Sequence, residues 1–83
     1  MQYSREELNN KIAAEFDIDV SLLVPEANIL KTLQVDSLGV MELVVLVKKT
    51  TGVLVPTLDL PGIVTFGHLY DYIEDKLISE NKE

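Results

Sequence analysis

The fold of this chain depends on one stretch, Val35-Asp36-Ser37-Leu38-Gly39-Val40-Met41-Glu42-Leu43-Val44-Val45-Leu46-Val47. Asp is among the best N-cap residues, because its carboxylate accepts a hydrogen bond from an amide two or three residues on and interacts favourably with the helix dipole. We therefore expect Asp36 to cap a helix that runs from about residue 37 to residue 50. Ser37 then falls on the first turn, where its hydroxyl is spare and the backbone N–H groups suit an attached anion. This geometry favours a phosphate ester on Ser37.

The same stretch is predicted to be a helix rather than a strand. Its valines favour strands, but a half-buried strand needs alternating apolar and polar residues, and there is no such alternation. Lys48 and Lys49 near the carboxyl end, and Gly52 just beyond it, are typical of a helix terminus. Eight of the ten residues from 38 to 47 are apolar, so one neighbouring element cannot cover the whole helix.

The two faces of this helix are assigned separately. The predicted core positions are Leu43, Val44, Leu46 and Val47, and the predicted exposed apolar patch beside Ser37 is Leu38, Met41 and Val45. The patch is either a docking surface, with Met41 as an adaptable contact, or ordinary core packing against the preceding loop. Glu42 either steers basic side chains of a partner or is a solvated helix residue.

Composition limits the class of protein. The 83 residues, 47% hydrophobic and 25% charged, are expected to form a single domain over residues 1–83 with a thin core. The net charge of −7 repels nucleic acid and anionic lipid and attracts proteins with basic patches. The sequence contains no cysteine, and no apolar run approaches the ~20 residues of a membrane span, so we expect a soluble, cytoplasmic protein.

The sequence offers no constellation for catalysis or metal binding. His68 is the only histidine, so the chain has neither a His-paired nucleophile nor a multi-histidine metal site. We expect His68 to lie at the surface or in a cleft. Acid pairs such as Glu74 with Asp75 lack the apolar pocket that raises one carboxyl pKa, and we interpret them as solvated. We therefore expect no enzyme activity and no metal site, and any chemistry is done to Ser37 by other proteins.

Caps and apolar spacing indicate two further helices. Ser4 with Glu7 forms a capping box for a helix over residues 4–16, and Thr65 is the predicted N-cap of a helix over residues 66–78. Both segments repeat apolar residues at helical spacing, which predicts one core-facing stripe on each.

The connections between the helices are less regular. Residues 17–35 carry no sustained period and are read as a long connection, with a short turn at 21–23 or 29–31. Near residues 59–63, Pro61 and Gly62 leave room for one turn at most, with Pro61 at its first position.

Asp36-Ser37-Leu38, followed by Glu42-Leu43, resembles the motif of the acyl carrier protein family, and the resemblance extends over nearly the whole chain. It implies an all-α fold, a small three- to four-helix bundle with a long first loop and a short or degraded third helix. It also implies a free-standing, monomeric carrier with a covalent 4′-phosphopantetheine cofactor on Ser37, next to Asp36 and Leu38. A phosphopantetheinyl transferase would attach this arm, which would then present acyl thioesters to acyl-transfer, condensing and modifying enzymes of fatty acid, polyketide or related lipid biosynthesis. Partner enzymes would contact Leu38, Met41, Glu42 and Val45 through basic docking patches.

The thin core adds a hypothesis about the cargo. An acyl chain would slip between the second and last helices near Leu43, Val47, Ile63 and Leu69, although the ordinary interpretation of these four residues is core packing.

The chain departs from the family pattern on the helix after Ser37. Many members carry further acids there, whereas this sequence has Gly39 and then Lys48-Lys49. The weaker acidic face leaves open whether the enzymes of general fatty acid synthesis accept this carrier, and a dedicated pathway is the alternative. Gly39 either lets a partner or the arm approach the backbone closely or is a tolerated small residue. Two alternatives remain open, an aminoacyl or peptidyl carrier and an unmodified helical adaptor that binds through the apolar patch.

Overall fold

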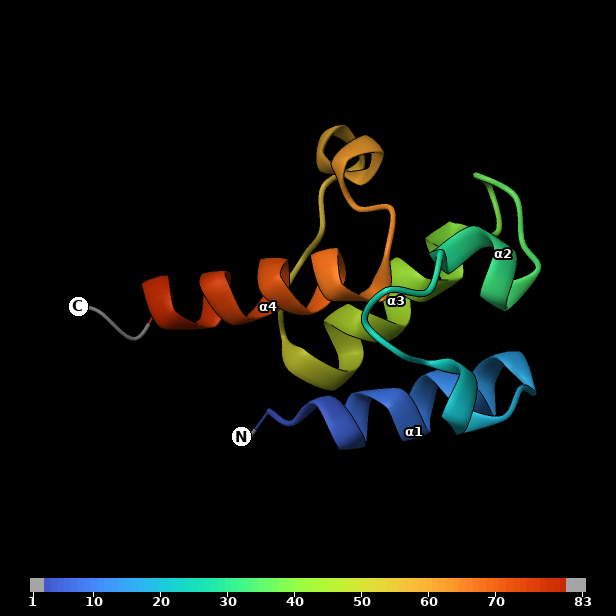
Figure 1. The fold of residues 1–83 in the computed structure, drawn as a ribbon. Helices are drawn as coiled ribbons and strands as arrows, with labels where there is room; N and C mark the ends of the chain where they lie inside the picture. The colour runs from blue at the N-terminus through green and yellow to red at the C-terminus, as the bar shows by residue number, and fades with distance from the viewer. Residues whose placement is uncertain (1–2, 81–83) are drawn as a thin grey trace.

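The computed structural model describes residues 3–80, and its regular elements over that range are all helical (Figure 1). In chain order they are α1 (Arg5–Phe16), the 3-10 helix η1 (Val20–Leu22), α2 (Ile29–Leu33), α3 (Val40–Thr51), the 3-10 helix η2 (Thr57–Gly62) and α4 (Phe66–Glu80). The predicted all-α fold, with a long first connection and a degraded third helix, is confirmed. Both turn positions suggested for the first connection are helical, as η1 and α2.

The first and last helices begin at the predicted caps. Ser4 Oγ accepts a 3.0 Å hydrogen bond from the N–H of Glu7, and Thr65 Oγ1 accepts a 3.2 Å bond from the N–H of His68. The His68 side chain reaches back toward the residues that precede the helix. Its Nδ1 accepts hydrogen bonds from the N–H groups of Val64 and Thr65 at 3.1 and 3.2 Å. The sequence placed His68 at the surface correctly but did not reveal this second cap.

α3 is assigned from Val40 rather than from residue 37, because residues 37–39 form a turn ahead of the regular helix. The N–H of Val40 donates to the Asp36 carbonyl at 3.1 Å, so helical hydrogen bonding nevertheless starts at Asp36. At the other end, Gly52 adopts φ 82°, a left-handed conformation that glycine reaches without steric cost. The predicted C-terminal stop is therefore confirmed.

Backbone hydrogen bonds hold the first connection against the start of α4. The N–H of Phe66 donates to the Ala27 carbonyl at 3.1 Å, and the N–H of Gly67 donates to the Pro25 carbonyl at 2.8 Å. First-turn amides have no partner inside their own helix, so the connection supplies one. A Cβ on Gly67 would lie 3.0 Å from the Pro25 oxygen, and glycine therefore permits this close approach.

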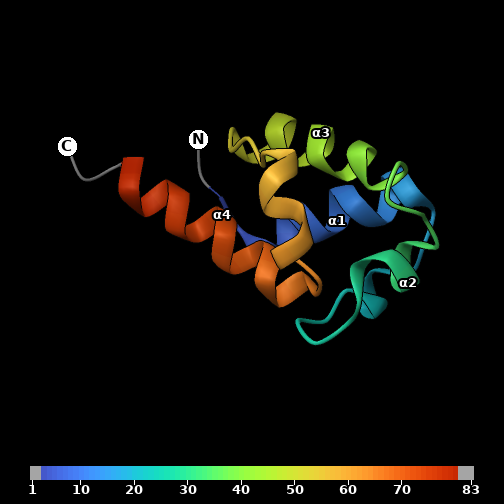
Figure 2. The same cartoon turned by 90° about the horizontal axis from the view of Figure 1, so that it is seen from above.

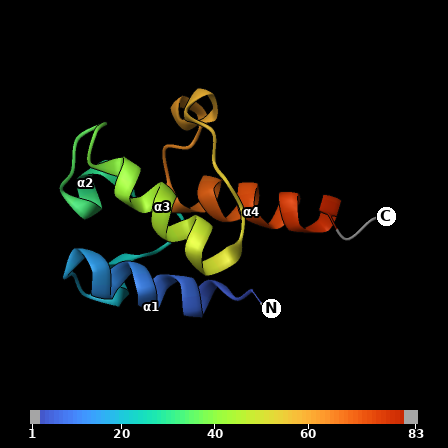
Figure 3. The same ribbon diagram turned by 180° about the vertical axis from the view of Figure 1, so that it is seen from behind.

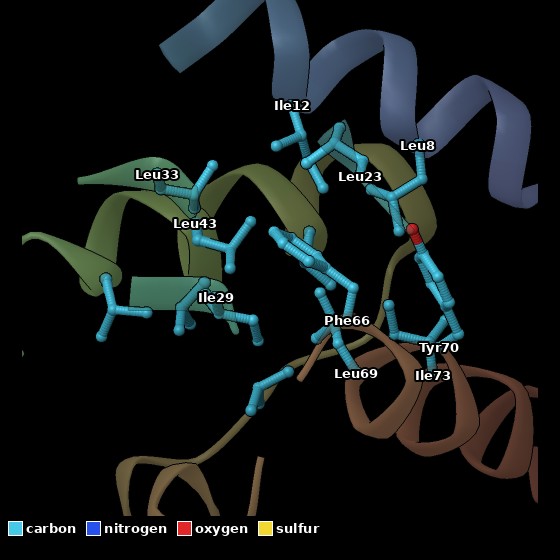
Figure 4. Packing of buried hydrophobic residues seen from close by; sticks show 14 of the residues in the cluster. Leu8, Ile12, Leu23, Ile29, Leu33, Leu43, Phe66, Leu69, Tyr70 and Ile73 are labelled. Atoms are coloured by element: carbon cyan, nitrogen blue, oxygen red, sulfur yellow. The ribbon is translucent and has the colours of Figure 1, made fainter. Parts of the chain in front are cut away.

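A single hydrophobic core lies between α1, α3 and α4 and extends to α2. Its largest fully buried side chains are Tyr70, Phe66, Leu8, Ile12, Ile73, Val47 and Val55. Phe66 and Tyr70 point from α4 toward Leu8 and Ile12 on α1 (Figure 4). Burying one large apolar side chain contributes roughly 1.5–3 kcal/mol, so these contacts dominate the stability of so small a domain.

Polar groups join the start of α1 to α4, and we call Tyr3, Arg5 and Glu74 the α1–α4 clasp. Arg5 donates from Nε and Nη2 to the two Glu74 carboxylate oxygens at 2.7 and 3.1 Å, and the Tyr3 hydroxyl donates to Glu74 Oε2 at 2.9 Å. The hydrogen bond from Arg5 holds the pKa of Glu74 below its ordinary value. The expectation that Glu74 is merely a solvated acid was wrong, because its partners lie far away in the sequence.

η2 lies on the side of α3 and α4 that faces away from α1 (Figures 1 and 3), and from above it lies across the space between those two helices (Figure 2). None of its six residues is buried, and Leu58 is 91% exposed. The prediction of one turn beginning at Pro61 was wrong. η2 begins directly after Pro56, and Pro61 lies inside it. Pro56 sets φ −65° at the start, and Pro61 removes only one hydrogen-bond donor from a short 3-10 helix.

Candidate functional site

Ser37 lies on an exposed turn immediately before α3, and Asp36 determines the shape of that turn. Asp36 Oδ1 accepts hydrogen bonds from the N–H groups of Leu38 and Gly39 at 3.1 and 2.8 Å. The capping hydrogen bonds predicted for Asp36 are present on the turn, whereas the N-cap of the regular helix is Gly39, which makes no side-chain cap bond. Because Asp36 satisfies both amides, the Ser37 hydroxyl is not needed as a cap and is left for other chemistry.

Gly39 is required by packing directly beside this turn. A Cβ on Gly39 would lie 2.8 Å from the Cβ of Val35 and 3.5 Å from Asp36 Oδ1. From the sequence, glycine at position 39 either lets a partner or the arm approach the backbone or is merely a tolerated small residue. The structure instead explains this glycine by a contact within the protein itself. The segment that precedes Ser37 folds back against the start of the helix, and only glycine permits this contact without movement.

A groove of about 500 Å³ opens beside Ser37, within the ~300–1,000 Å³ typical of small-molecule sites. α2, the start of α3 and η2 with the residues that follow it form its walls. Its apolar lining consists of Ile29, Leu30, Leu38, Val40, Met41, Leu60, Pro61, Ile63 and Val64. This groove suits an apolar group that is tethered at Ser37.

The outer face of α3 continues from Ser37 along the helix. Leu38 is 80% exposed, Met41 37% and Val45 51%, and Glu42 is exposed between them. The exposure of this predicted patch is therefore confirmed, although exposure alone does not test binding. On the inner face Leu43, Val44 and Val47 are buried as predicted, whereas Leu46 is only half-buried at the edge of the core.

The four residues of the predicted acyl pocket are brought together. Leu43, Val47 and Leu69 are buried, Ile63 is half-buried, and all four line one internal void between α3 and α4. The void measures about 10 Å³, at the ~10–15 Å³ limit for a single water molecule. In this conformation the space between these helices is closed core, and the open volume lies in the groove beside Ser37.

Sequence reasoning missed several residues that line this site, among them Val40 and Leu60. Val40 is buried and lines both the groove and the internal void, and its spacing from Leu43, Val44 and Val47 is a helical signal that could have found it. Leu60 also lines both cavities, but it lies in a short 3-10 helix where no periodicity marks the inward side.

Residues 3–80 contain neither a candidate membrane span nor a candidate metal site. None of the helices in that range is both long and apolar enough to cross a membrane. The same part of the chain brings together no group of three or more His, Cys, Asp or Glu side chains suited to a metal ion.

Known proteins resemble this chain over most of its length. The family described as "Phosphopantetheine attachment site" matches residues 6–73. The acyl carrier protein of Helicobacter pylori (strain G27) is 34% identical over 74 residues, which cover 89% of this chain and 95% of that protein. The chain belongs to the acyl carrier protein family. A second acyl carrier protein, from Syntrophobacter fumaroxidans (strain DSM 10017 / MPOB), is 36% identical over 62 residues, covering 75% of this chain and 76% of its own.

Membership of the acyl carrier protein family establishes the cofactor and the general role. Acyl carrier proteins hold 4′-phosphopantetheine covalently, act as carriers rather than catalysts, and interact with transferases and biosynthetic enzymes. The turn at Ser37 fits such a group on structural grounds. It offers an exposed hydroxyl whose neighbouring amides are already capped, beside an apolar groove with room for a tethered chain.

Proposed function

We propose that Ser37 carries the 4′-phosphopantetheine arm, with Asp36 and Leu38 as its flanking residues. The capped turn carries this proposal, because Asp36 Oδ1 engages the amides of Leu38 and Gly39 and leaves the exposed Ser37 available to a transferase. An arm attached here has its phosphate close to the amino end of α3, where the helix dipole favours negative charge.

The attachment is a phosphoryl transfer at Ser37 Oγ. The oxygen forms a bond to the coenzyme A phosphorus that bears pantetheine, the bond from that phosphorus to the bridging oxygen breaks, and the adenosine bisphosphate leaves. The hydroxyl proton passes to a base of the transferase, because the Asp36 oxygen that faces this turn is held by the Leu38 and Gly39 amides. The attached arm supplies a terminal thiol that holds acyl groups as thioesters.

We further propose that partner enzymes contact the outer face of α3 through Leu38, Met41, Glu42 and Val45. Glu42 adds a negative charge to an apolar surface in a protein of net charge −7, which favours a basic patch on the partner. Lys48 and Lys49 carry the opposite charge at the far end of the same helix. This mixed face supports dedicated partners rather than the enzymes of general fatty acid synthesis.

The proposed cargo is an acyl group used in fatty acid, polyketide or related biosynthesis. The apolar groove beside Ser37 supports acyl cargo, with Leu43, Val47, Ile63 and Leu69 as the deeper part of the same proposed pocket. The largely apolar lining of this groove favours an acyl chain over a charged aminoacyl group. The monomeric state and the cytoplasmic location expected from the sequence stay predictions.

The test is to incubate the protein with coenzyme A and a broad-specificity phosphopantetheinyl transferase and to measure its intact mass. The proposal predicts a gain of one phosphopantetheine group in the wild type and in Ser21→Ala, a matched control at another exposed serine. Ser37→Ala should gain nothing. An unchanged mass of the wild type would favour an unmodified adaptor, and a gain in Ser37→Ala would exclude Ser37 as the attachment site.

A further inference from the structure

A second groove lies between α1 and the outer face of α3, and we call it the α1–α3 groove. Its volume is about 330 Å³. It borders the groove beside Ser37, because Met41 lines both of them. The lining comes from two helices, with Glu15 from α1 and Met41, Glu42, Val45, Leu46 and Lys49 from α3.

The charged residues of the α1–α3 groove are ordered along its length. α1 and α3 run in opposite directions (Figures 1 and 3), so the carboxyl end of α1, which holds Glu15, lies beside the first turns of α3, which hold Glu42. Lys49 lies in the last turn of α3. Glu42 and Lys49 are two helical turns apart on one face, a separation of roughly 10 Å along the axis. The groove therefore has two acids at the end nearer Ser37 and a lysine at the other end.

These three charges are available to a partner. Glu15, Glu42 and Lys49 are exposed, and Arg5 forms both of the salt bridges found within residues 3–80. The neighbouring Lys48 is placed differently, because its Nζ donates a 3.2 Å hydrogen bond to the Gly52 carbonyl at the end of the helix. Of these two lysines, Lys49 is the one that lines the groove.

The floor between the charges is apolar and accessible. Val45 is 51% exposed, Met41 is 37% exposed, and Leu46 is half-buried. A concave apolar surface suits an apolar anchor of a partner, and the flexible Met41 side chain can adapt to its shape. Charges at the edge of such a contact set its register and exclude wrong partners.

We propose that the α1–α3 groove binds a partner surface that carries an apolar anchor between a basic and an acidic side chain. The basic side chain pairs with Glu15 and Glu42, and the acidic one pairs with Lys49. The inference rests on the proposed function, which assigns the outer face of α3 to partner enzymes. It adds α1 to the contact and requires an acid on the partner, because a uniformly basic patch would bring like charge against Lys49.

The experiment titrates the protein with two synthetic alanine-based helical peptides and records its amide chemical shifts. The bipolar peptide carries Arg, Leu and Glu at the spacing of Glu42, Val45 and Lys49, and the basic peptide has Arg in place of its Glu. The wild type should bind the bipolar peptide about three- to tenfold more tightly, with the largest shifts along the α1–α3 groove. Added salt should reduce this preference.

Charge variants of the protein locate the preference. Lys49→Glu should reverse it, so that the basic peptide binds more tightly. Lys49→Gln should abolish it, and this milder change keeps the comparison if an acid in the last turn prevents folding. Lys76→Glu is the matched control, because it changes the net charge equally at an exposed position of α4 outside the groove, and it should keep the wild-type preference. Glu15→Gln should weaken binding of both peptides, since each carries a basic residue.

The possible failures can be told apart. Equal affinity of the wild type for the two peptides, binding of neither, or shifts confined to other surfaces would overturn the proposed partner chemistry. Equal responses of Lys49→Glu and Lys76→Glu would also overturn it, because they would show an effect of net charge alone. Unchanged binding by Glu15→Gln would remove α1 from the contact. The proposed attachment at Ser37 fails separately, through absence of the mass gain, because the peptide titrations use the unmodified protein.

Discussion

The α1–α4 side of the molecule and the side formed by α2 and η2 are built differently. On the first side Leu8, Ile12 and Phe66 are fully buried, and Arg5 binds Glu74 through two hydrogen bonds. On the second side none of the residues of η2 is buried, and an open groove of about 500 Å³ separates the elements. Because Ile29 and Leu33 of α2 are buried in the core, the thinly packed part of the second side is η2 and the groove beside it.

This difference suggests how so small a domain combines stability with adaptability. Elements with little buried surface open at low free-energy cost, whereas core helices open only with the whole fold. Because η2 forms one wall of the groove, the shape of the groove can change while α1, α3 and α4 remain packed.

The largest effect is expected from Phe66→Ala on the packed side. Phe66 is fully buried, and truncating a buried Phe typically costs ~3–5 kcal/mol, much of the roughly 4–12 kcal/mol expected for a chain of this length. Urea unfolding followed by circular dichroism should show the loss. Leu58→Ala on η2 is the control and should change the free energy of unfolding by no more than ~0.5 kcal/mol. Equal losses in the two variants would contradict the contrast between the two sides.

A smaller effect is expected from Gly39→Ala, which alters the turn that holds Ser37. Overpacking usually costs ~1–3 kcal/mol, and better helix propensity returns ~1 kcal/mol or less, so we expect a net loss of ~1–2 kcal/mol. The added Cβ would lie 2.8 Å from the Cβ of Val35, so the turn must shift and modification of Ser37 should slow.

Gly62→Ala is the matched control for Gly39→Ala, because no atom lies within 4 Å of a Cβ at that position. It should leave the modification rate unchanged and the stability unchanged or slightly higher. A Gly39→Ala protein that is as stable and as quickly modified as Gly62→Ala would show that the close contact with Val35 is unimportant.

The α1–α4 clasp should give a pH-dependent effect of ~1 kcal/mol or less, because Arg5 and Glu74 are partly exposed. The pKa of Glu74 is lowered in the folded protein, mainly by the hydrogen bond from Arg5. Its contribution to stability is therefore fully present above the ordinary Glu value of 4.5 and is lost as the pH falls through the lowered value.

Thermal unfolding of the wild type and Glu74→Gln at a series of pH values measures this contribution. The difference between them should be constant near neutral pH and should shrink below about pH 4.5. Asp75→Asn, at a neighbouring exposed position on α4, should show no such difference. A gap between the wild type and Glu74→Gln that persists unchanged in acid would be inconsistent with an ion-pair origin.

The smallest effect is expected from Tyr72→Phe, which removes the link between α4 and η2. The hydrogen bond to Asp59 raises the pKa of Tyr72 to about 12. The link therefore stabilises the fold below the ordinary Tyr value of 10 and is lost as the pH rises toward 12. At neutral pH the variant should lose only a few tenths of a kcal/mol.

Hydrogen exchange is the sensitive measurement for Tyr72→Phe. The amides of Asp59 and Ile63, which hydrogen-bond within η2, should exchange faster, while those of α1 should keep their protection. Faster exchange throughout the molecule would show instead that η2 and the core open together.

The sequence predicted the elements that local chemistry defines. Ser4, Asp36 and Thr65 were identified as caps because each is followed by amides that need an acceptor, and the hydrogen bonds are present. The exposure of Leu38, Met41 and Val45 followed from a helix too apolar for one neighbour to cover.

Features that depend on distant residues were not predictable in the same way. The bond between Arg5 and Glu74 joins residues at opposite ends of the chain, and the role of Gly39 depends on where Val35 folds back. η2 was underestimated because propensity rules treat Pro61 as a terminator, whereas a 3-10 helix accommodates it. The groove beside Ser37 is formed by three separate elements, so no single stretch of sequence contains its pattern.

The identity of the modified residue is determined most directly by fragmentation mass spectrometry of the transferase-treated protein. We predict that the mass of one phosphopantetheine group is found on the peptide that contains Asp36-Ser37-Leu38, and on Ser37 within it. Finding that mass on any other residue, or finding this peptide unmodified in a protein that has gained mass, would contradict the assignment of Ser37.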